Sequence, residues 1–216
     1  RVTVLKSARV GYTQLLSGII ASYCANQPCP ILAVQPTADD ARDYAVDLEA
    51  LFEASPVLRG ILSDEADETG RSTMLNRKFP GGSLKFLAAK SPRNLRRHTA
   101  KILLLDEIDG YEVSQEGDPI ALAEMRTMTF RDRKIIAGST PVFDFGPATR
   151  LYSKSDQRVF EVPCPSCGEF SEVKWADIRW IEGDPDSAHW VCPSHGCIVE
   201  ERQKPEIVAA GRWRPT

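Results

Sequence analysis

The sequence predicts an α/β fold, in which helices flank a mostly parallel sheet and a small cysteine-containing module follows. Short apolar runs alternate with segments of helical periodicity from residue 1 to about residue 157. From about Arg158 the pattern changes to short strands, four tryptophans and two pairs of cysteines. We therefore expect one α/β domain over residues 1–157 and a separate module over residues 158–216.

Hydrophobic spacing and turn residues place the individual elements. A strand from Val2 ends in a loop of small residues, and apolar residues then recur at helical spacing over Tyr12–Ala25. Pro80, Gly81 and Gly82 predict a hairpin, which we expect to be an insertion at the edge of the sheet. The other expected strands are Ile31–Val34, Met74–Phe79, Ser83–Leu87, Lys101–Leu105 and Lys134–Ala137. A second expected helix begins after Thr37. The other expected helices cover Pro92–Arg97, Pro119–Met128 and Pro205–Ala210.

The loop after the first strand is similar to a phosphate-binding loop whose cation has moved. Against the pattern GxxxxGK[ST], Gly11 and Thr13 fit, while Lys6 replaces the first glycine and Tyr12 replaces the lysine. Gly11 allows close approach of the backbone to phosphate, Thr13 offers a hydroxyl to Mg²⁺, and Lys6 or Arg9 supplies the cation. The expected phosphate-contacting residues are Lys6, Ser7, Ala8, Arg9, Val10, Gly11, Tyr12 and Thr13. The alternative is an ordinary strand–turn–helix connection.

The segment ILLLDEID, residues 102–109, places two adjacent carboxylates after a continuous apolar run. Ligands bind at the carboxyl ends of the strands in parallel sheets, so these acids are expected at a ligand site. We expect Asp106 to hold Mg²⁺ and Glu107 to polarise the attacking water, because phosphoryl transfer requires both roles. Asp109 is expected in a turn or cap. The alternative is a solvated acidic turn without catalytic chemistry.

A third motif, Gly138-Ser139-Thr140, ends the next expected strand. In a parallel sheet these residues would lie beside Asp106. Ser139 and Thr140 are expected to sense the γ-phosphate and to couple its loss to movement of the next element. By chemistry alone, an ordinary strand-ending turn fits these residues almost as well.

Taken in order, LKSARVGYT, ILLLDEID, GSTP and CPSCG resemble the ATPase domain of the phage terminase large subunit, in particular the lambda-type, GpA-like family. The resemblance implies a P-loop NTPase fold of the ASCE, helicase-like class. It assigns phosphate binding to the loop from Lys6 to Thr13, Mg²⁺ and water activation to Asp106 and Glu107, and coupling to Ser139 and Thr140. It also implies an adenine-contacting segment before Arg1 and a nuclease domain after Thr216, so no nuclease activity is assigned here.

The same resemblance implies the partners and the setting. The implied partners are double-stranded DNA, a small terminase subunit and a portal. The full-length protein is expected to form a homo-oligomeric motor, in the host cytoplasm. No apolar run reaches the roughly 18 residues that a membrane span needs, and no signal sequence is recognisable. We therefore expect no membrane association and no secretion.

The cysteine pairs predict a structural zinc site. Cys164 and Cys167 form one pair, and Cys192 and Cys197 form the other, a set of four thiolates typical of tetrahedral zinc. Disulfides are the alternative, and His195 inside the second pair leaves the fourth ligand open. The remaining cysteines, Cys24 and Cys29, and the lone histidines His98 and His189 are not expected to bind metal.

Charge distribution limits the mode of any nucleic-acid binding. The net charge is −3, from 27 Lys and Arg against 30 Asp and Glu, which argues against binding by bulk positive charge. The basic segment, Lys90–Lys101, contains no acid and is either a solvated face or a phosphate-contacting or DNA-contacting surface. The resemblance points to Ser91, Arg96 or Arg97 within it.

Two other functions remain compatible with the motifs. A helicase-like translocase on DNA or RNA uses the same acidic strand and the same coupling motif. A zinc-stabilised scaffold that binds nucleotide without hydrolysis is favoured by Tyr12 in the lysine position. An arginine from a neighbouring subunit is expected to complete the site if the chain is an ATPase.

Overall fold

The computed structural model describes residues 1–62 and 75–216, and the chain divides into two compact units. The first unit is Arg1–Tyr152 and the second is Ser153–Thr216. The sequence predicts the boundary between the two parts a few residues later, between residues 157 and 158. No helix in the described residues has the length and apolar character needed to cross a bilayer.

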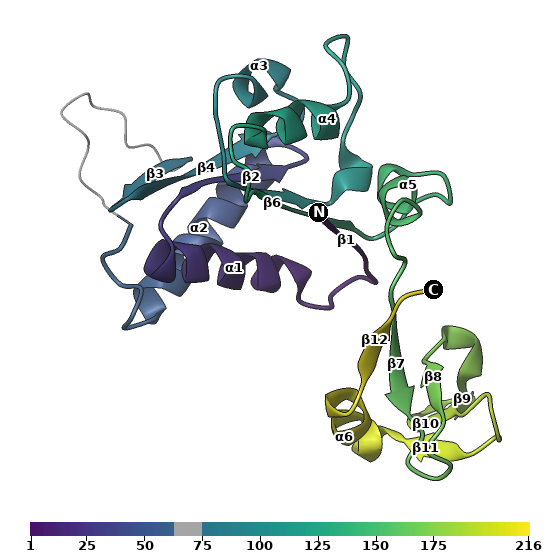
Figure 1. The fold of residues 1–216 in the computed structure, drawn as a ribbon. Helices are drawn as coiled ribbons and strands as arrows, with labels where there is room; N and C mark the ends of the chain where they lie inside the picture. Colours follow the sequence, from purple (N-terminus) through teal and green to yellow (C-terminus); the bar gives the residue numbers. More distant parts are fainter. Residues whose placement is uncertain (63–74) are drawn as a thin grey trace. The chain divides into compact units, whose positions relative to one another are not determined.

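A six-stranded sheet organises the first unit, in the order β1-β6-β5-β2-β4-β3 (Figure 1). The strands are β1 (Val2–Leu5), β2 (Pro30–Gln35), β3 (Asn76–Phe79), β4 (Gly82–Ala88), β5 (Ile102–Asp106) and β6 (Lys134–Ser139). Every neighbouring pair is parallel except β3 and β4. The five parallel strands therefore bring their carboxyl ends to one edge, as the mostly parallel prediction requires.

Only one strand of the hairpin around Gly81 lies at the edge of the sheet, whereas the sequence predicted that the whole hairpin is an insertion at the edge. β3 is indeed the antiparallel edge strand, but β4 pairs in parallel with β2 from Pro30 opposite Ser83 to Gln35 opposite Ala88. Leu84 and Phe86 of β4 are fully buried, because alternate residues of this strand face the core. Met74, the predicted start of the first run, lies outside the described residues.

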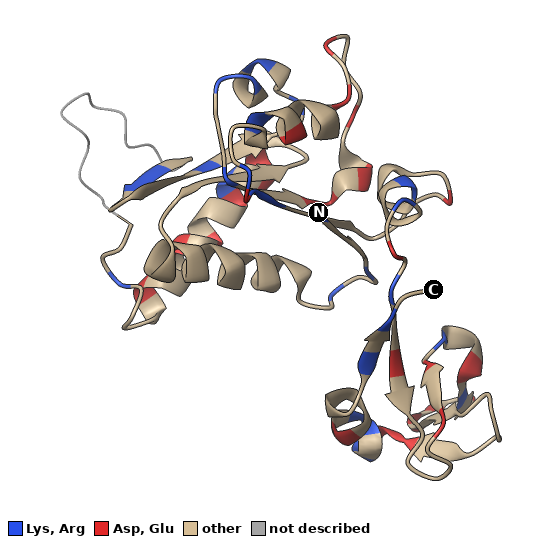
Figure 2. Cartoon of the chain, in the orientation of Figure 1, with Lys and Arg blue, Asp and Glu red and all other residues tan. Residues whose placement is uncertain are grey.

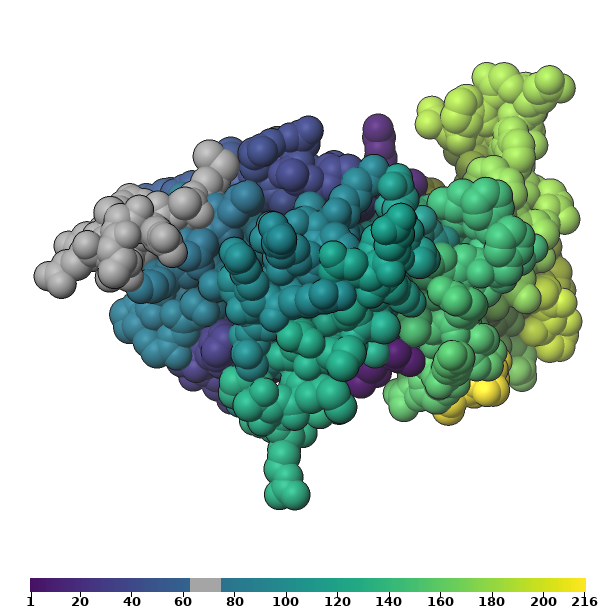
Figure 3. Space-filling view, turned by 90° about the horizontal axis from the view of Figure 1, so that it is seen from above, coloured from purple at the N-terminus to yellow at the C-terminus, as the bar shows by residue number. Residues whose placement is uncertain are grey.

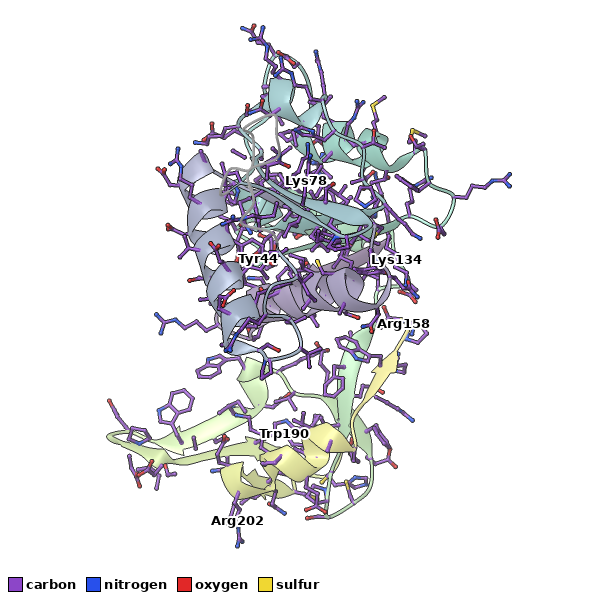
Figure 4. The ribbon with its side chains drawn as sticks, turned by 90° about the vertical axis from the view of Figure 1, so that its left-hand side faces the viewer. Tyr44, Lys78, Lys134, Arg158, Trp190 and Arg202 are labelled. Atoms are coloured by element: carbon purple, nitrogen blue, oxygen red, sulfur yellow. The ribbon has the colours of Figure 1, made fainter. Side chains whose placement is uncertain are left out.

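Two helices cover one face of the sheet and shorter helices cover the other (Figure 1). The long helices are α1 (Tyr12–Asn26) and α2 (Ala38–Ala54), and Tyr44 of α2 lies between the helices and the sheet (Figure 4). α2 begins after Thr37, as predicted, and Thr37 and Asp40 form a capping box there. The opposite face carries α3 (Pro92–Leu95), α4 (Pro119–Glu124) and α5 (Pro147–Tyr152).

Three short helical segments differ from the sequence prediction. The predicted helix Pro119–Met128 is α4 followed by a 3-10 turn, η2 (Met125–Thr127). The sequence prediction did not include α5 or the 3-10 turn η1 (Ile108–Gly110) that follows β5. Elements of three to six residues carry too few turns for hydrophobic periodicity to reveal them.

The second unit contains two three-stranded sheets, β12-β7-β8 and β11-β10-β9. The strands are β7 (Val159–Pro163), β8 (Phe170–Glu172), β9 (Ile178–Ile181), β10 (Asp184–Val191), β11 (Ile198–Glu200) and β12 (Arg212–Arg214). The helical segments are η3 (Trp175–Asp177), η4 (Glu201–Gln203) and α6 (Lys204–Ala209). Trp190 lies at the centre of this unit (Figure 4), in a small core with Val162, Val199 and Ile207.

Glu161 connects β7 to the last strand of this unit. Its carboxylate accepts a hydrogen bond from Arg214 Nε at 2.7 Å and from Arg212 Nη2 at 3.3 Å. The hydrogen bond from Arg214 is the main cause that lowers the pKa of Glu161. A depressed pKa means that the ionised carboxylate stabilises the folded unit at neutral pH, and that this contribution disappears as the pH falls through the folded-state pKa.

We expect Glu161→Gln to lower the melting temperature of the second unit at pH 7, because both arginines lose their ionic partner. The difference from the wild type should begin to shrink as the pH falls below the ordinary glutamate pKa of about 4.3, and should disappear once the pH has passed through the lower pKa of the folded state. All four tryptophans, Trp175, Trp180, Trp190 and Trp213, belong to this unit, so tryptophan fluorescence reports its unfolding alone.

Glu172→Gln is the matched control for this measurement. Glu172 lies opposite Glu161 in the β7–β8 pair, and its contact is a 3.6 Å ion pair with Lys174 on the surface. Exposed ion pairs contribute little to stability. Equal shifts for the two variants at pH 7 would contradict a specific role for Glu161.

Candidate functional site

The loop between β1 and α1 has the backbone geometry of an anion-binding loop. Arg9 and Gly11 both have left-handed backbone angles, with φ of 59° and 78°. Gly11 directly precedes α1, a helix of 15 residues whose first N–H groups have no partner within the helix. These N–H groups and the helix dipole favour a negatively charged ligand at this position. Ser7, Ala8, Arg9, Val10 and Gly11 are all exposed.

Lys6 reaches the centre of the site from the end of β1. Its Nζ lies 2.5 Å from Glu107 Oε1 and 3.3 Å from Thr140 Oγ1, and its side chain is 8% exposed. Its backbone N–H donates to Ser139 O, which fixes the start of the loop against β6. Of the two cations that the sequence proposed, Lys6 therefore points into the site, while Arg9 belongs to the exposed part of the loop.

Thr13 and Asp106 meet, as the P-loop pattern requires. Thr13 Oγ1 donates to Asp106 Oδ2 at 2.9 Å, and Asp106 is buried. Burial raises the pKa of Asp106 and the charge of Glu107 raises it further, whereas hydrogen bonds from Thr13 and Gln35 oppose the shift. A hydroxyl beside a buried carboxylate is suited to Mg²⁺, which binds through oxygen ligands and retained waters.

Glu107 is held at both carboxylate oxygens. Oε1 contacts Lys6, and Oε2 accepts hydrogen bonds from Ser139 Oγ at 3.1 Å and from the Thr140 N–H at 3.4 Å. Glu107 also has a left-handed backbone, with φ of 49°, which is strained for a residue with a side chain. Its side chain is 44% exposed, so this acid faces solvent while Asp106 does not.

Asp109 has the capping role that the sequence suggested. Its carboxylate accepts hydrogen bonds from the backbone N–H of Ala148 at 2.8 Å and of Val142 at 3.0 Å. A methyl group on Gly146 would lie 2.5 Å from Asp109 Oδ2, so this close approach requires glycine. Asp109 thereby ties the start of α5 to the acidic segment after β5.

Gln35 is a site residue that the sequence analysis missed. It ends β2 and is buried, and its side chain amide lowers the pKa of Asp106. β2 and β5 are neighbouring parallel strands, which brings Gln35 to the same edge as Asp106. The available signal was a polar residue at the end of an apolar strand, just before Pro36.

Both cysteine pairs fold into the same backbone turn. The N–H of Gly168 donates to Cys164 O, and the N–H of Gly196 donates to Cys192 O, both at 2.8 Å. The two glycines have left-handed φ values of 76° and 67°. In the first turn, the N–H groups of Cys167 and Ser166 donate to the Cys164 sulfur. They outweigh its burial, which raises the pKa, so that the pKa falls to about 7.

The sulfur atoms of the two turns converge. Those of Cys164, Cys167 and Cys192 all lie within 4.8 Å of one another, and the distance from Cys167 to Cys192 is 3.8 Å. Tetrahedral zinc with bonds of about 2.3 Å separates its sulfur ligands by about 3.8 Å, so the donor set and the spacing fit zinc. The cluster contains three of the four predicted ligands, and Cys197 is not among the sulfur atoms that lie within 4.8 Å of one another. His195, the other candidate for the fourth ligand, is exposed.

The other cysteines and histidines have ordinary structural surroundings. Cys24 and Cys29 are buried thiols, and burial raises the pKa of Cys24 to about 12. His98 Nδ1 lies 3.0 Å from Lys85 Nζ, and His189 Nδ1 lies 2.9 Å from Ser187 O. Within residues 1–62 and 75–216, the one potential metal cluster of three or more side chains is the cysteine cluster.

The basic segment, Lys90–Lys101, acquires acidic partners in the fold. Lys90 pairs with Glu112 at 2.9 Å, and Arg96 pairs with Glu116 at 2.9 Å. Figure 2 shows its cationic residues around α3, and Figure 3 looks down on this face, where teal atoms form the surface. Ser91 is half-buried. Two cations of this segment therefore already have carboxylate partners within the same chain.

A comparison with known protein families identifies the chain. The family described as "Phage terminase large subunit gpA, ATPase domain" matches residues 1–213. The chain belongs to this family. The terminase large subunit of Enterobacteria phage P21 is 28% identical over 231 residues, covering 98% of this chain and 35% of that protein. The large subunit of Escherichia phage lambda is 28% identical over 214 residues, covering 94% and 33%.

The gpA-type ATPase domain described here thus spans about a third of the length of these two relatives. A crystal structure of the HK97 bacteriophage large terminase has the same fold, with a TM-score of 0.57 and 14% identity. That match covers 70% of this chain and 31% of the HK97 protein. The predicted resemblance and the mixed α/β architecture with a mostly parallel sheet are therefore confirmed.

Asp109→Ala tests the connection between the acidic segment and α5. The substitution removes the acceptor for two N–H groups near the start of α5, and we expect it to destabilise the first unit by about 1–2 kcal/mol. Hydrogen exchange should accelerate in residues 142–152 first. Asp144→Ala, an exposed neighbour, is the control, and unchanged exchange in Asp109→Ala would contradict the capping role.

Proposed function

We propose that this chain is the ATP-hydrolysing motor domain of a phage terminase large subunit, which drives double-stranded DNA into the capsid. The observation that supports this function most is the meeting of three motifs at one sheet edge. Lys6 and Thr13 from the loop contact Glu107 and Asp106, and Ser139 and Thr140 contact Glu107. This is the P-loop NTPase arrangement, with a lysine displaced to the start of the loop.

Each residue then has a distinct part in hydrolysis. The N–H groups of the loop and of α1 bind the phosphates of ATP, and Lys6 neutralises their charge. Asp106 and Thr13 hold Mg²⁺, which when bound polarises the phosphate oxygens. Glu107 orients the attacking water and accepts its proton.

The contacts of Glu107 link hydrolysis to movement. Lys6 contacts Oε1 of Glu107, and its transfer to phosphate would remove a cation from the carboxylate and leave Glu107 a stronger base toward water. Ser139 and Thr140 hold the other oxygen and carry changes at the carboxylate into β6 and the segment after it. An arginine from a neighbouring subunit supplies further positive charge in a homo-oligomeric motor.

The partners of the full-length protein follow from the same proposal. They are double-stranded DNA, a small terminase subunit and a portal, in the cytoplasm of the host. Residues 1–152 act as the ATPase unit. The second unit is a zinc ribbon-like module that connects it to later parts of the protein.

The second part of the proposal is a structural Zn²⁺ held by Cys164, Cys167, Cys192 and Cys197. The convergence of the Cys164, Cys167 and Cys192 sulfur atoms supports it, and so do the paired backbone turns, which bring Cys197 into the second turn as Cys167 is in the first. Four thiolates close the coordination sphere and leave no position for water, so the metal stabilises this unit and takes no part in hydrolysis.

Glu107→Gln should separate hydrolysis from nucleotide binding. Loss of the water-orienting carboxylate is expected to lower ATP turnover by about 10²–10⁴-fold, while binding of a fluorescent ATP analogue persists. Glu112→Gln changes an exposed glutamate outside the site and is the control.

Other outcomes of this experiment favour the other functions. Unchanged turnover in Glu107→Gln would contradict the assignment of this residue. Nucleotide binding by the wild type without turnover would favour the scaffold. Strand separation by the full-length protein, in place of packaging of intact duplex, would favour the helicase-like translocase.

Metal analysis of the purified protein tests the zinc site. We expect one Zn²⁺ per chain, lost in Cys192→Ser together with the thermal stability of the second unit. Cys29→Ser changes a buried cysteine of the first unit and should retain the metal. Substoichiometric zinc after gentle purification would contradict the four-thiolate site.

A further inference from the structure

Tyr12 occupies the position at which the P-loop pattern has its lysine, yet its side chain does not point toward the ligand side of the loop. It is the first residue of α1, and it is 5% exposed within the core that α1 and α2 form with the sheet. The loop therefore replaces a phosphate-binding cation with a buried aromatic ring. Filling of the core alone does not explain why the ring lies in this place.

The ring of Tyr12 lies against the backbone of β6 beside the catalytic acids. A methyl group on Gly138 would come within 2.4 Å of Tyr12 Cζ and 2.8 Å of Cε1, so the phenol fills the space that a side chain at residue 138 would need. Gly138 is paired with Asp106 on one side and with Val4 of β1 on the other. The ring thus lies against β6, the strand between β1, which leads to Lys6, and β5, which ends at Asp106.

The ring also lies beneath the displaced cation. Lys6 Nζ is 5.6 Å from the centroid of the Tyr12 ring, within the range of a cation–π interaction. The other contacts of Nζ are Glu107 and Thr140. In the proposed function Lys6 moves from Glu107 to phosphate, so its contact with Glu107 does not hold it throughout the cycle. The ring is a support for the ammonium group that does not compete for the carboxylate.

We propose that Tyr12 is a positioning residue, whose ring holds the Lys6 ammonium group over the phosphate-binding loop. This inference rests on the proposed binding of ATP phosphate by Lys6. The ring carries this role and the hydroxyl does not, because Tyr12 Oη is buried and has no hydrogen-bond partner among the residues the structure describes. Phenylalanine is therefore equivalent to tyrosine here, and an aliphatic residue is not.

The test compares ATP affinity and steady-state kinetics in Lys6→Ala, Tyr12→Phe, Tyr12→Leu and the double variant Lys6→Ala/Tyr12→Leu. Tyr12→Leu is expected to weaken ATP binding by about 2- to 30-fold, the range of one cation–π contact, with a larger change in KM than in kcat. Tyr12→Phe should retain wild-type affinity. In the Lys6→Ala background, Tyr12→Leu should add no further loss, because both substitutions remove one coupled interaction.

Tyr44→Leu is the matched control for loss of a buried ring. Tyr44 is equally buried in the same core, where its ring packs edge-on against Phe86. It should lower the melting temperature and leave ATP affinity within twofold of wild type. If Tyr12→Leu behaves like Tyr44→Leu, Tyr12 is a core residue only and the inference is overturned.

Gly138→Ala examines the same contact without changing Tyr12. The added methyl group must displace the phenol ring, so ATP affinity should fall as in Tyr12→Leu. Gly18→Ala, in α1 with open space around it, is the control. Wild-type affinity in folded Gly138→Ala would also overturn the inference.

The experiment distinguishes failure of this inference from failure of the proposed function. If Lys6→Ala retains wild-type affinity, the displaced-cation assignment is wrong, and the role of Tyr12 that depends on it is wrong as well. If Lys6→Ala weakens binding while Tyr12→Leu and Gly138→Ala do not, only the positioning role is wrong.

Discussion

The arrangement of the candidate site depends most on the contacts of one carboxylate, that of Glu107. One oxygen contacts Lys6, and the other accepts hydrogen bonds from Ser139 and Thr140. These three partners come from the ends of β1 and β6, while Glu107 follows β5, which pairs with β6 on the side away from β1. A change in the charge near any one of these groups therefore reaches the ends of three parallel strands through hydrogen bonds of about 3 Å, without a change of fold.

Two adjacent acids have different surroundings in this arrangement. Asp106 is the last residue of β5 and is buried, whereas Glu107 turns away from the sheet through a left-handed backbone. Burial makes the ionised form of Asp106 costly, and Thr13 and Gln35 offset part of that cost by donating hydrogen bonds. A divalent cation at Asp106 would reduce the cost further, while Glu107 stays accessible to water.

The sequence predicted the parts of this site that depend on local pattern. The apolar run before Asp106 predicted a buried strand, and the loop pattern predicted that Thr13 begins a helix and lies near the acid. Gln35 was missed because its approach to Asp106 depends on β2 lying next to β5, and strand order is not written in any local pattern. Tyr12 was assigned to the loop as a whole, and the burial of its side chain depends on the missing Cβ of Gly138.

The charged face around α3 has a consequence for contact with polyanions. In the sequence the basic segment has no acid, but in the fold Lys90 and Arg96 are paired with Glu112 and Glu116. A phosphate backbone that approaches this face has to exchange with carboxylates that are already there, and the gain on contact is smaller than the number of cations suggests. Such a face binds a polyanion weakly and releases it easily, and the strength of the contact depends on the salt concentration.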